Sequence, residues 1–127
     1  MNVELLAKIC QIPGTSGFEQ QVRAFVENEI KDYVDEIDID NMGNLYAIKR
    51  GKTNKRVMCA AHMDEIGFMV KYIDDKGFIR FHTLGGFDPK TLTAQRVIIH
   101  GKKDLMGVMG SKPIHVMTPD ERNKLAK

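Results

Sequence analysis

Residues 56–67 decide the fold that this sequence is expected to adopt, and they read Arg56-Val57-Met58-Cys59-Ala60-Ala61-His62-Met63-Asp64-Glu65-Ile66-Gly67. From Val57 to Ala61 the stretch is continuously apolar and does not alternate between apolar and polar residues. An apolar run of this kind is typical of a strand that is buried on both faces, in the middle of an α/β sheet. We therefore predict a central strand over residues 56–61, with the thiol of Cys59 inside the core.

His62 and Asp64 directly follow this predicted strand. Ligands of open α/β sheets gather beyond the carboxyl ends of the strands. A histidine there can bind a metal ion through one ring nitrogen, while its other nitrogen needs an acceptor. Asp64 is two residues further on, so in an extended backbone it projects to the same side as His62. The pattern indicates a metal ligand with a carboxylate partner, although a packed or surface histidine stays open from these residues alone.

Three helices are predicted from the spacing of apolar residues and from capping patterns. Residues 3–10 follow helical spacing. Ser16 and Glu19 have the spacing of a capping box, in which the serine hydroxyl accepts from the Glu19 amide, and the helix that follows runs to Ile30. Thr118 is the expected N-cap of a short C-terminal helix with proline at its first position.

Short strands make up the other predicted elements. Two precede the central strand, at residues 34–40 and 45–49. Four follow it, separated by turns rich in glycine and aspartate, at residues 68–73, 78–82, 96–99 and 105–109. Short strands with frequent turns are typical of a small β-barrel or sandwich. The predicted fold is thus a partial α/β sheet with flanking helices in a domain of residues 1–67, followed by a small barrel-like β domain of residues 68–127.

Composition excludes several classes of function. The 127 residues are 43% hydrophobic and 28% charged, as expected for one ordinary globular domain. The net charge of +2 indicates neither a nucleic acid nor a membrane as partner. Two cysteines do not make a disulfide framework and fit a reducing compartment. The N-terminus has no basic run followed by an apolar stretch, so we expect a cytoplasmic protein without a secretion signal.

Several motifs, taken together, resemble one family of peptidases. They cover nearly the whole chain and are Ile12-Pro13-Gly14-Thr15-Ser16-Gly17-Phe18-Glu19, Asn41-Met42-Gly43-Asn44-Leu45, Ala61-His62-Met63-Asp64-Glu65-Ile66-Gly67, Gly85-Gly86-Phe87-Asp88-Pro89, Gln95-Arg96-Val97 and Gly110-Ser111-Lys112-Pro113-Ile114-His115. In this order they are similar to the start of the glutamyl/deblocking aminopeptidase family. Its members are dinuclear-metal peptidases that form tetrahedral particles, and some are labelled endoglucanases.

The resemblance implies roles for individual residues. His62 matches a ligand of one of two divalent metal ions, usually zinc or cobalt in the family. Asp64 matches the catalytic-site aspartate that orients this histidine. Residues from Phe68 onward match an inserted β domain that mediates subunit contacts. The implied activity is that of a metal-dependent aminopeptidase, which removes N-terminal amino acids from peptides. The implied partners are a peptide substrate and either further copies of the chain or a complementary C-terminal chain.

The resemblance also implies that the site is incomplete in this chain. In the family, the bridging aspartate, the general-base glutamate, the other acidic ligands and the second histidine ligand all come after the inserted domain. We therefore expect the chain alone to be inactive. An alternative from a different class of function is a non-catalytic structural or assembly fragment of the same family.

A third interpretation, a glycosidase, comes from the endoglucanase labels alone. Glycoside hydrolysis uses two carboxyl groups that face each other across the bond, roughly 5–10 Å apart. Asp64 and Glu65 are neighbours and diverge in an extended backbone, so they fit this arrangement poorly. His82, His100 and His115 match no catalytic ligand of the family, and we interpret them as strand or loop residues.

Overall fold

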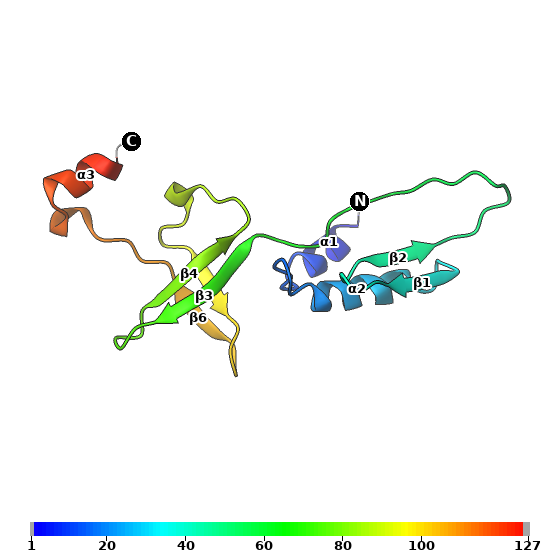
Figure 1. The fold of residues 1–127 in the computed structure, drawn as a ribbon, viewed down its shortest axis with the longest axis horizontal. Helices are drawn as coiled ribbons and strands as arrows, with labels where there is room; N and C mark the ends of the chain where they lie inside the picture. Colours follow the sequence, from blue (N-terminus) through cyan, green and yellow to red (C-terminus); the bar gives the residue numbers. More distant parts are fainter. Residues whose placement is uncertain (1, 126–127) are drawn as a thin grey trace. The chain divides into compact units, whose positions relative to one another are not determined.

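The computed structural model describes residues 2–125. Its elements follow one another along the chain (Figure 1) as α1 (Val3–Ile9), α2 (Gln20–Ile30), β1 (Glu36–Ile39), β2 (Leu45–Ile48), β3 (Gly67–Ile73), β4 (Ile79–Leu84), the 3-10 turn η1 (Pro89–Thr91), β5 (Arg96–Ile99), β6 (Leu105–Val108), the 3-10 turn η2 (Ile114–Val116) and α3 (Pro119–Leu125). Contacts between residues divide the chain into two compact units, residues 1–86 and 87–127. The predicted domains, residues 1–67 and 68–127, stay a prediction. The division into compact units reflects contacts between residues, whereas the predicted boundary separates a catalytic domain from an inserted one. Residues 126 and 127 of the second domain lie outside the described residues.

The helical part of the first unit is built around α2 and the β1–β2 hairpin. The two strands pair antiparallel, with Glu36 opposite Ile48 and Ile39 opposite Leu45, and α2 contacts β2. Among the described residues, Val22 on α2 is the only buried hydrophobic side chain, with 3% of its surface exposed. The two helices and two strands predicted for this region are confirmed. No helix in the described part of the chain has the length and apolar character needed to cross a bilayer.

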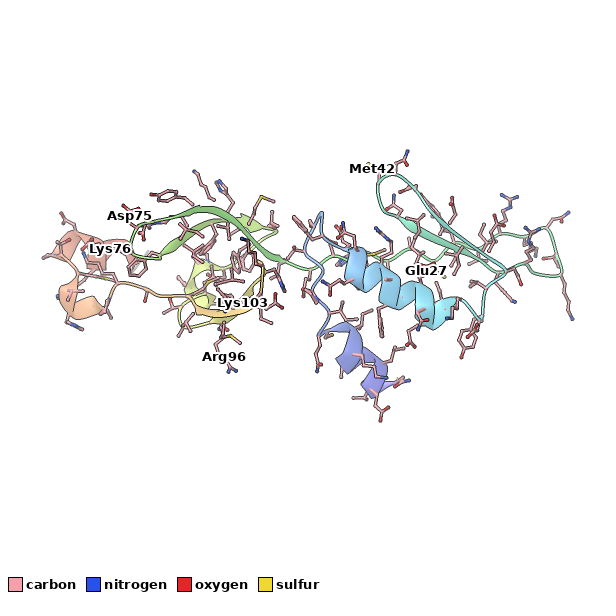
Figure 2. The ribbon with its side chains drawn as sticks, turned by 90° about the horizontal axis from the view of Figure 1, so that it is seen from below. Glu27, Met42, Asp75, Lys76, Arg96 and Lys103 are labelled. Atoms are coloured by element: carbon pink, nitrogen blue, oxygen red, sulfur yellow. The ribbon has the colours of Figure 1, made fainter. Side chains whose placement is uncertain are left out.

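Asp40 organises the turn between β1 and β2. Its Oδ1 accepts from the backbone amides of Met42 and Asn44, both at 2.9 Å. Its Oδ2 accepts from the Asn44 side chain at 2.8 Å and from the Tyr46 hydroxyl at 3.1 Å. Gly43 has a φ of 86°, which glycine adopts without steric cost, and Figure 2 shows Met42 beside it at the tip. The bonds from Asn44 hold the pKa of Asp40 below its usual range.

We expect acid to loosen the β1–β2 hairpin through Asp40. Because folding lowers the pKa of Asp40, its carboxylate stabilises the turn above the ordinary value of 3.8, and this contribution is lost as the pH falls through the folded value. Asp40→Asn keeps an acceptor oxygen but removes the charge, so it should abolish this part of the acid transition. Amide chemical shifts of the hairpin, followed by NMR during acid titration, measure the effect. Asp38→Asn, on the adjoining strand β1, is the control, and an equal effect from both variants would contradict the expectation.

The β3–β4 hairpin forms at the predicted position and completes the first unit. Its strands pair antiparallel, and a β-bulge interrupts their register between Val70 and Tyr72. The rings of Phe68 and Phe81 pack edge to face, with their centroids 4.7 Å apart. Figure 2 shows Asp75 at the turn that joins the strands. The two aromatic rings therefore stabilise one face of an otherwise exposed hairpin.

The second unit contains the β5–β6 hairpin and α3, both of which were predicted. The Thr118 hydroxyl accepts from the Glu121 amide at 3.3 Å, and the Glu121 carboxylate accepts from the Thr118 amide at 2.8 Å. This reciprocal capping box explains why α3 begins after Thr118. The barrel-like closure of the β domain stays a prediction, because each sheet in the described residues has two strands.

The prediction of a central strand over residues 56–61 is wrong for this structure. Residues 55–64 belong to no helix or strand, and Val57 and Met58 are 91% and 88% exposed. Cys59, predicted to be a core thiol, is also exposed. A strand forms only where a neighbouring strand supplies hydrogen-bond partners. Among the described residues no strand pairs with this segment, which Figure 1 shows as a long connection from β2 to β3.

Candidate metal centre

The structure brings His62 and Asp64, the two predicted site residues, into direct contact. Nδ1 of His62 lies 3.0 Å from Oδ1 of Asp64 and 3.1 Å from its carbonyl oxygen. Both oxygens can only accept, so this geometry requires Nδ1 to carry the proton. The Nε2 lone pair is then the one left for a cation. The His62 side chain is 86% exposed, so nothing in the described residues covers that nitrogen. Their roles as metal ligand and orienting aspartate stay a prediction.

Ser16 binds the second oxygen of the same carboxylate. Its hydroxyl donates to Oδ2 of Asp64 at 2.5 Å, a short bond of the kind that ionised acceptors make. This bond is the largest cause that holds the pKa of Asp64 below its usual range, with a smaller contribution from the bond to His62 and an opposing one from partial burial. Ser16 is therefore a site residue that sequence reasoning missed. The two residues are 48 positions apart, and no local pattern links them.

The capping box predicted for Ser16 and Glu19 is wrong. Glu19 is itself the N-cap of α2 and makes no side-chain capping bond. Its carboxylate accepts instead from the Gly17 amide at 2.7 Å. The local spacing suits a capping box, but Gly17 has a φ of 86° and α2 begins only at Gln20, so Ser16 does not occupy the N-cap position.

The loop that carries Ser16 is bonded to the segment that carries Asp64. The Gly14 amide donates to the Glu65 carboxylate at 3.1 Å, and the Glu65 amide donates to the Gly14 carbonyl at 2.7 Å. Thr15 and Glu65 form an isolated parallel bridge. Asp64 and Glu65 thus have different partners, the first a hydroxyl and an imidazole, the second a backbone amide. The result is a two-segment site in which residues 14–16 support residues 62–65.

Gly67 allows these two segments to approach each other. It is buried, and a methyl group in place of its hydrogen would overlap the side chain of Thr15. Gly67→Ala is therefore expected to destabilise the fold by about 1–3 kcal/mol, the usual cost of overpacking. Thermal or denaturant unfolding measures the change.

The matched control for this substitution is Gly86→Ala, because nothing lies within 4 Å of the methyl group it would add. It should change stability by less than about 0.5 kcal/mol. Equal stability losses in the two variants would show that the contact between Gly67 and Thr15 is not needed.

Two hollows border His62 in the first unit. A small, mainly polar one of about 160 Å³ is lined by Glu19, Met42, Gly43, Asn44, Ala61, His62, Met63 and Asp64. A larger apolar one of about 440 Å³ is lined by residues of α1, α2 and β2 and by Ala61, His62, Met63 and Glu65. The imidazole therefore stands where a polar hollow and an apolar hollow meet, as ligand-binding sites commonly require.

Comparison with known proteins shows which family has these residues. The M42 glutamyl aminopeptidase family matches residues 43–127, more than half of the chain. The chain belongs to this family. The resemblance predicted from the sequence motifs is thereby confirmed.

Curated relatives of this M42 chain are named aminopeptidases. A putative aminopeptidase of Acetivibrio thermocellus is 47% identical over 120 residues, which cover 94% of this chain and 34% of the relative. The lysyl aminopeptidase of Pyrococcus furiosus is 44% identical over 115 residues, which cover 89% of this chain and 33% of the relative. The chain thus spans about a third of the length of these relatives.

Solved structures with the same fold are named peptidases or endoglucanases. A TET aminopeptidase from a Thaumarchaeota archaeon matches with a TM-score of 0.90 at 36% identity, over 96% of this chain and 35% of that chain. An endoglucanase of Thermotoga maritima matches with a TM-score of 0.74 at 38% identity, over 84% and 33%. The TET1 peptidase of Pyrococcus horikoshii, which can assemble into a tetrahedron or a large octahedral shell, matches with a TM-score of 0.78 at 39% identity, over 92% and 35%.

For the divalent metal implied by the family, His62 and Asp64 offer an imidazole nitrogen and a carboxylate bonded to the same ring. A catalytic zinc site needs about three protein ligands. Within residues 2–125 no three histidine, cysteine, aspartate or glutamate side chains gather around a common point. Of the other histidines, His82 lies on β4, His100 pairs with Asp104 at 2.9 Å, and His115 lies on η2. The further ligands of a complete site are therefore not among the described residues.

Proposed function

We propose that this chain supplies a metal-ligand histidine, His62, and its orienting aspartate, Asp64, to a metal-dependent aminopeptidase. The substrate class is peptides, from which N-terminal amino acids are removed. The complete site holds two divalent ions, zinc or cobalt. When bound, such a pair supplies an activated water and stabilises the charge of the tetrahedral intermediate.

One observation carries the proposal, namely the contact between the His62 ring and Asp64. Because Nδ1 is bonded at 3.0 Å to the carboxylate, the ring is held with Nε2 outward. This is the arrangement of a metal-binding histidine whose second nitrogen is fixed by a carboxylate. The polar hollow beside the ring can receive a substrate group.

The remaining ligands are proposed to come from the part of the family fold that this chain does not span. They belong either to the same polypeptide or to a complementary C-terminal chain. We further propose a homo-oligomer, because the relative from Pyrococcus horikoshii assembles into closed shells. The proposed location is the cytoplasm, since Cys10 and Cys59 are free and exposed thiols that persist in a reducing compartment.

A second candidate function is a structural or assembly module without catalysis. It is favoured by the lack of any group of three potential ligands among residues 2–125. In this case the β3–β4 and β5–β6 hairpins would serve subunit contacts, and His62 would keep its position without a role in catalysis.

A chimera separates the two candidates. Residues 1–127 replace the matched third of the Acetivibrio relative, which supplies the rest of the family fold. With zinc or cobalt added, the chimera is expected to hydrolyse amino-acid p-nitroanilides, whereas this chain alone is expected to be inactive. A folded chimera without hydrolysis would favour the assembly module. Activity of the chain alone would contradict the view that its site is incomplete.

A further inference from the structure

We propose that Ser16 is a positioning residue for the metal-ligand histidine, holding the Asp64 carboxylate in the one orientation that keeps Nε2 of His62 available. The proposal deepens the proposed function and rests on it for the identity of the ligand. It adds a third residue, from a distant segment of the sequence, to the pair that the family resemblance implies.

The two oxygens of the Asp64 carboxylate have different partners. Oδ1 lies 3.0 Å from Nδ1 of His62, and Oδ2 accepts from the Ser16 hydroxyl at 2.5 Å. An aspartate with a bond at only one oxygen can rotate about its side-chain torsion, which is broad for a terminal carboxylate. A bond at each oxygen fixes the plane of the group. The Asp64 side chain is 39% exposed, so without Ser16 water would compete for the freed oxygen.

The backbone on both sides of Ser16 holds its hydroxyl in place. On its N-terminal side, two bonds join Gly14 to Glu65, at 2.7 and 3.1 Å. On its C-terminal side, the Phe18 amide donates to the Thr15 carbonyl at 2.8 Å, and Gly17 has a φ of 86°. The hydroxyl is therefore presented by a turn of defined shape.

The contacts of Ser16 exclude two simpler roles for its side chain. It does not cap α2, because Glu19 is the N-cap and no side chain makes a capping bond there. It is not needed merely to join the two segments, because Gly14 and Glu65 already make two bonds between them. The remaining role for its hydroxyl is to orient the carboxylate of Asp64.

The test reads the proton position on the His62 ring directly. The full chain is labelled uniformly with ¹⁵N, and the ring nitrogen shifts of its four histidines are recorded at about pH 8, above the ordinary histidine pKa of about 6.5. In the unsubstituted chain we expect His62 to carry its proton on Nδ1. Ser16→Ala should shift the ring part of the way toward the Nε2-protonated form, since the Asp64 carbonyl, 3.1 Å from Nδ1, remains as an acceptor. Ser16→Thr, which keeps the hydroxyl, should restore the original spectrum.

His100 supplies an internal control within the same spectrum. Its Nδ1 pairs with Asp104 at 2.9 Å, and within residues 2–125 no serine bonds to that carboxylate, so its ring signals should not change in either variant. An unchanged His62 ring in Ser16→Ala would overturn the proposal. A change that appears equally in the backbone amides of α2 would also overturn it, since Ser16 would then act on the fold as a whole.

A second measurement distinguishes this proposal from the proposed function. In the chimera, Ser16→Ala should weaken zinc binding roughly 10-fold, the lower end of the range for residues that orient a metal ligand, and Ser16→Thr should recover most of it. A tautomer change with an inactive chimera would support the positioning role and count against the peptidase. An active chimera whose Ser16→Ala variant keeps both zinc affinity and tautomer would overturn only the positioning role.

Discussion

Replacing His62 by alanine is expected to lower peptide hydrolysis by the chimera by more than about 100-fold. Loss of a residue that only orients a ligand typically costs 10–100-fold in metal affinity or activity, so loss of the ligand itself should cost more. The Nδ1 contact to Asp64 at 3.0 Å leaves Nε2 as the coordinating atom, and alanine offers no replacement. Steady-state hydrolysis of an amino-acid p-nitroanilide, together with the zinc content of the purified protein, measures the effect.

The matched control for His62→Ala is His100→Ala. The His100 side chain is 52% exposed, and its Nδ1 is also bonded to an aspartate, Asp104, at 2.9 Å. It matches no ligand of the family, so its loss should change turnover by less than about twofold, within the small effects of surface substitutions. Retained turnover in His62→Ala, or equal losses in the two variants, would remove the basis of the peptidase proposal.

Self-association of the isolated chain is the second large effect that we expect. Residues 55–64 form no helix or strand, and no strand in the described part of the chain pairs with them. Val57 and Met58 within this segment are 91% and 88% exposed. An extended apolar segment with unpaired amides and carbonyls is a template for pairing with another chain. Light scattering should therefore give a mass of at least twice the 14.4 kDa of one chain.

Charge placed in this segment should prevent the association. The double variant Val57→Lys with Met58→Lys is expected to shift the chain to its monomer mass, because lysine on an unpaired segment opposes strand pairing. Tyr33→Lys is the control, since Tyr33 is 75% exposed but lies outside the unpaired segment. A sharp monomer peak of the unsubstituted chain, or dissociation by Tyr33→Lys as well, would contradict this expectation.

Local information was sufficient for most elements of the chain. The helices α1, α2 and α3 and the strands β1 to β6 lie where periodicity and turn residues predicted them. Each hairpin is closed by a turn that carries its own hydrogen bonds, as Asp40 does between β1 and β2. Such interactions join residues within a few positions, so a short stretch of sequence specifies them.

The run at residues 56–61 shows where local information ends. Its apolar composition is that of a central strand, yet the residues are exposed and unpaired. A strand's hydrogen bonds belong to a pair of segments, and one segment alone cannot make them. The apolar composition therefore predicted a strand that needs partners on both sides. No strand among residues 2–125 pairs with the run, which accounts for its exposed, irregular backbone.

For the candidate metal centre, the sequence by itself determined that His62 and Asp64 would meet, because two residues in extended backbone project to one side. Only the tertiary structure decided that Ser16 joins them. The sequence predicted that the Ser16 hydroxyl accepts from the nearby Glu19 amide in a capping box. In the structure this hydroxyl donates to a carboxylate 48 positions away. The physical reason is that Gly17, with a φ of 86°, ends the turn before the helix, so α2 begins only at Gln20 and Ser16 is not its N-cap. Only the fold brings the Asp64 oxygen within reach of the Ser16 hydroxyl.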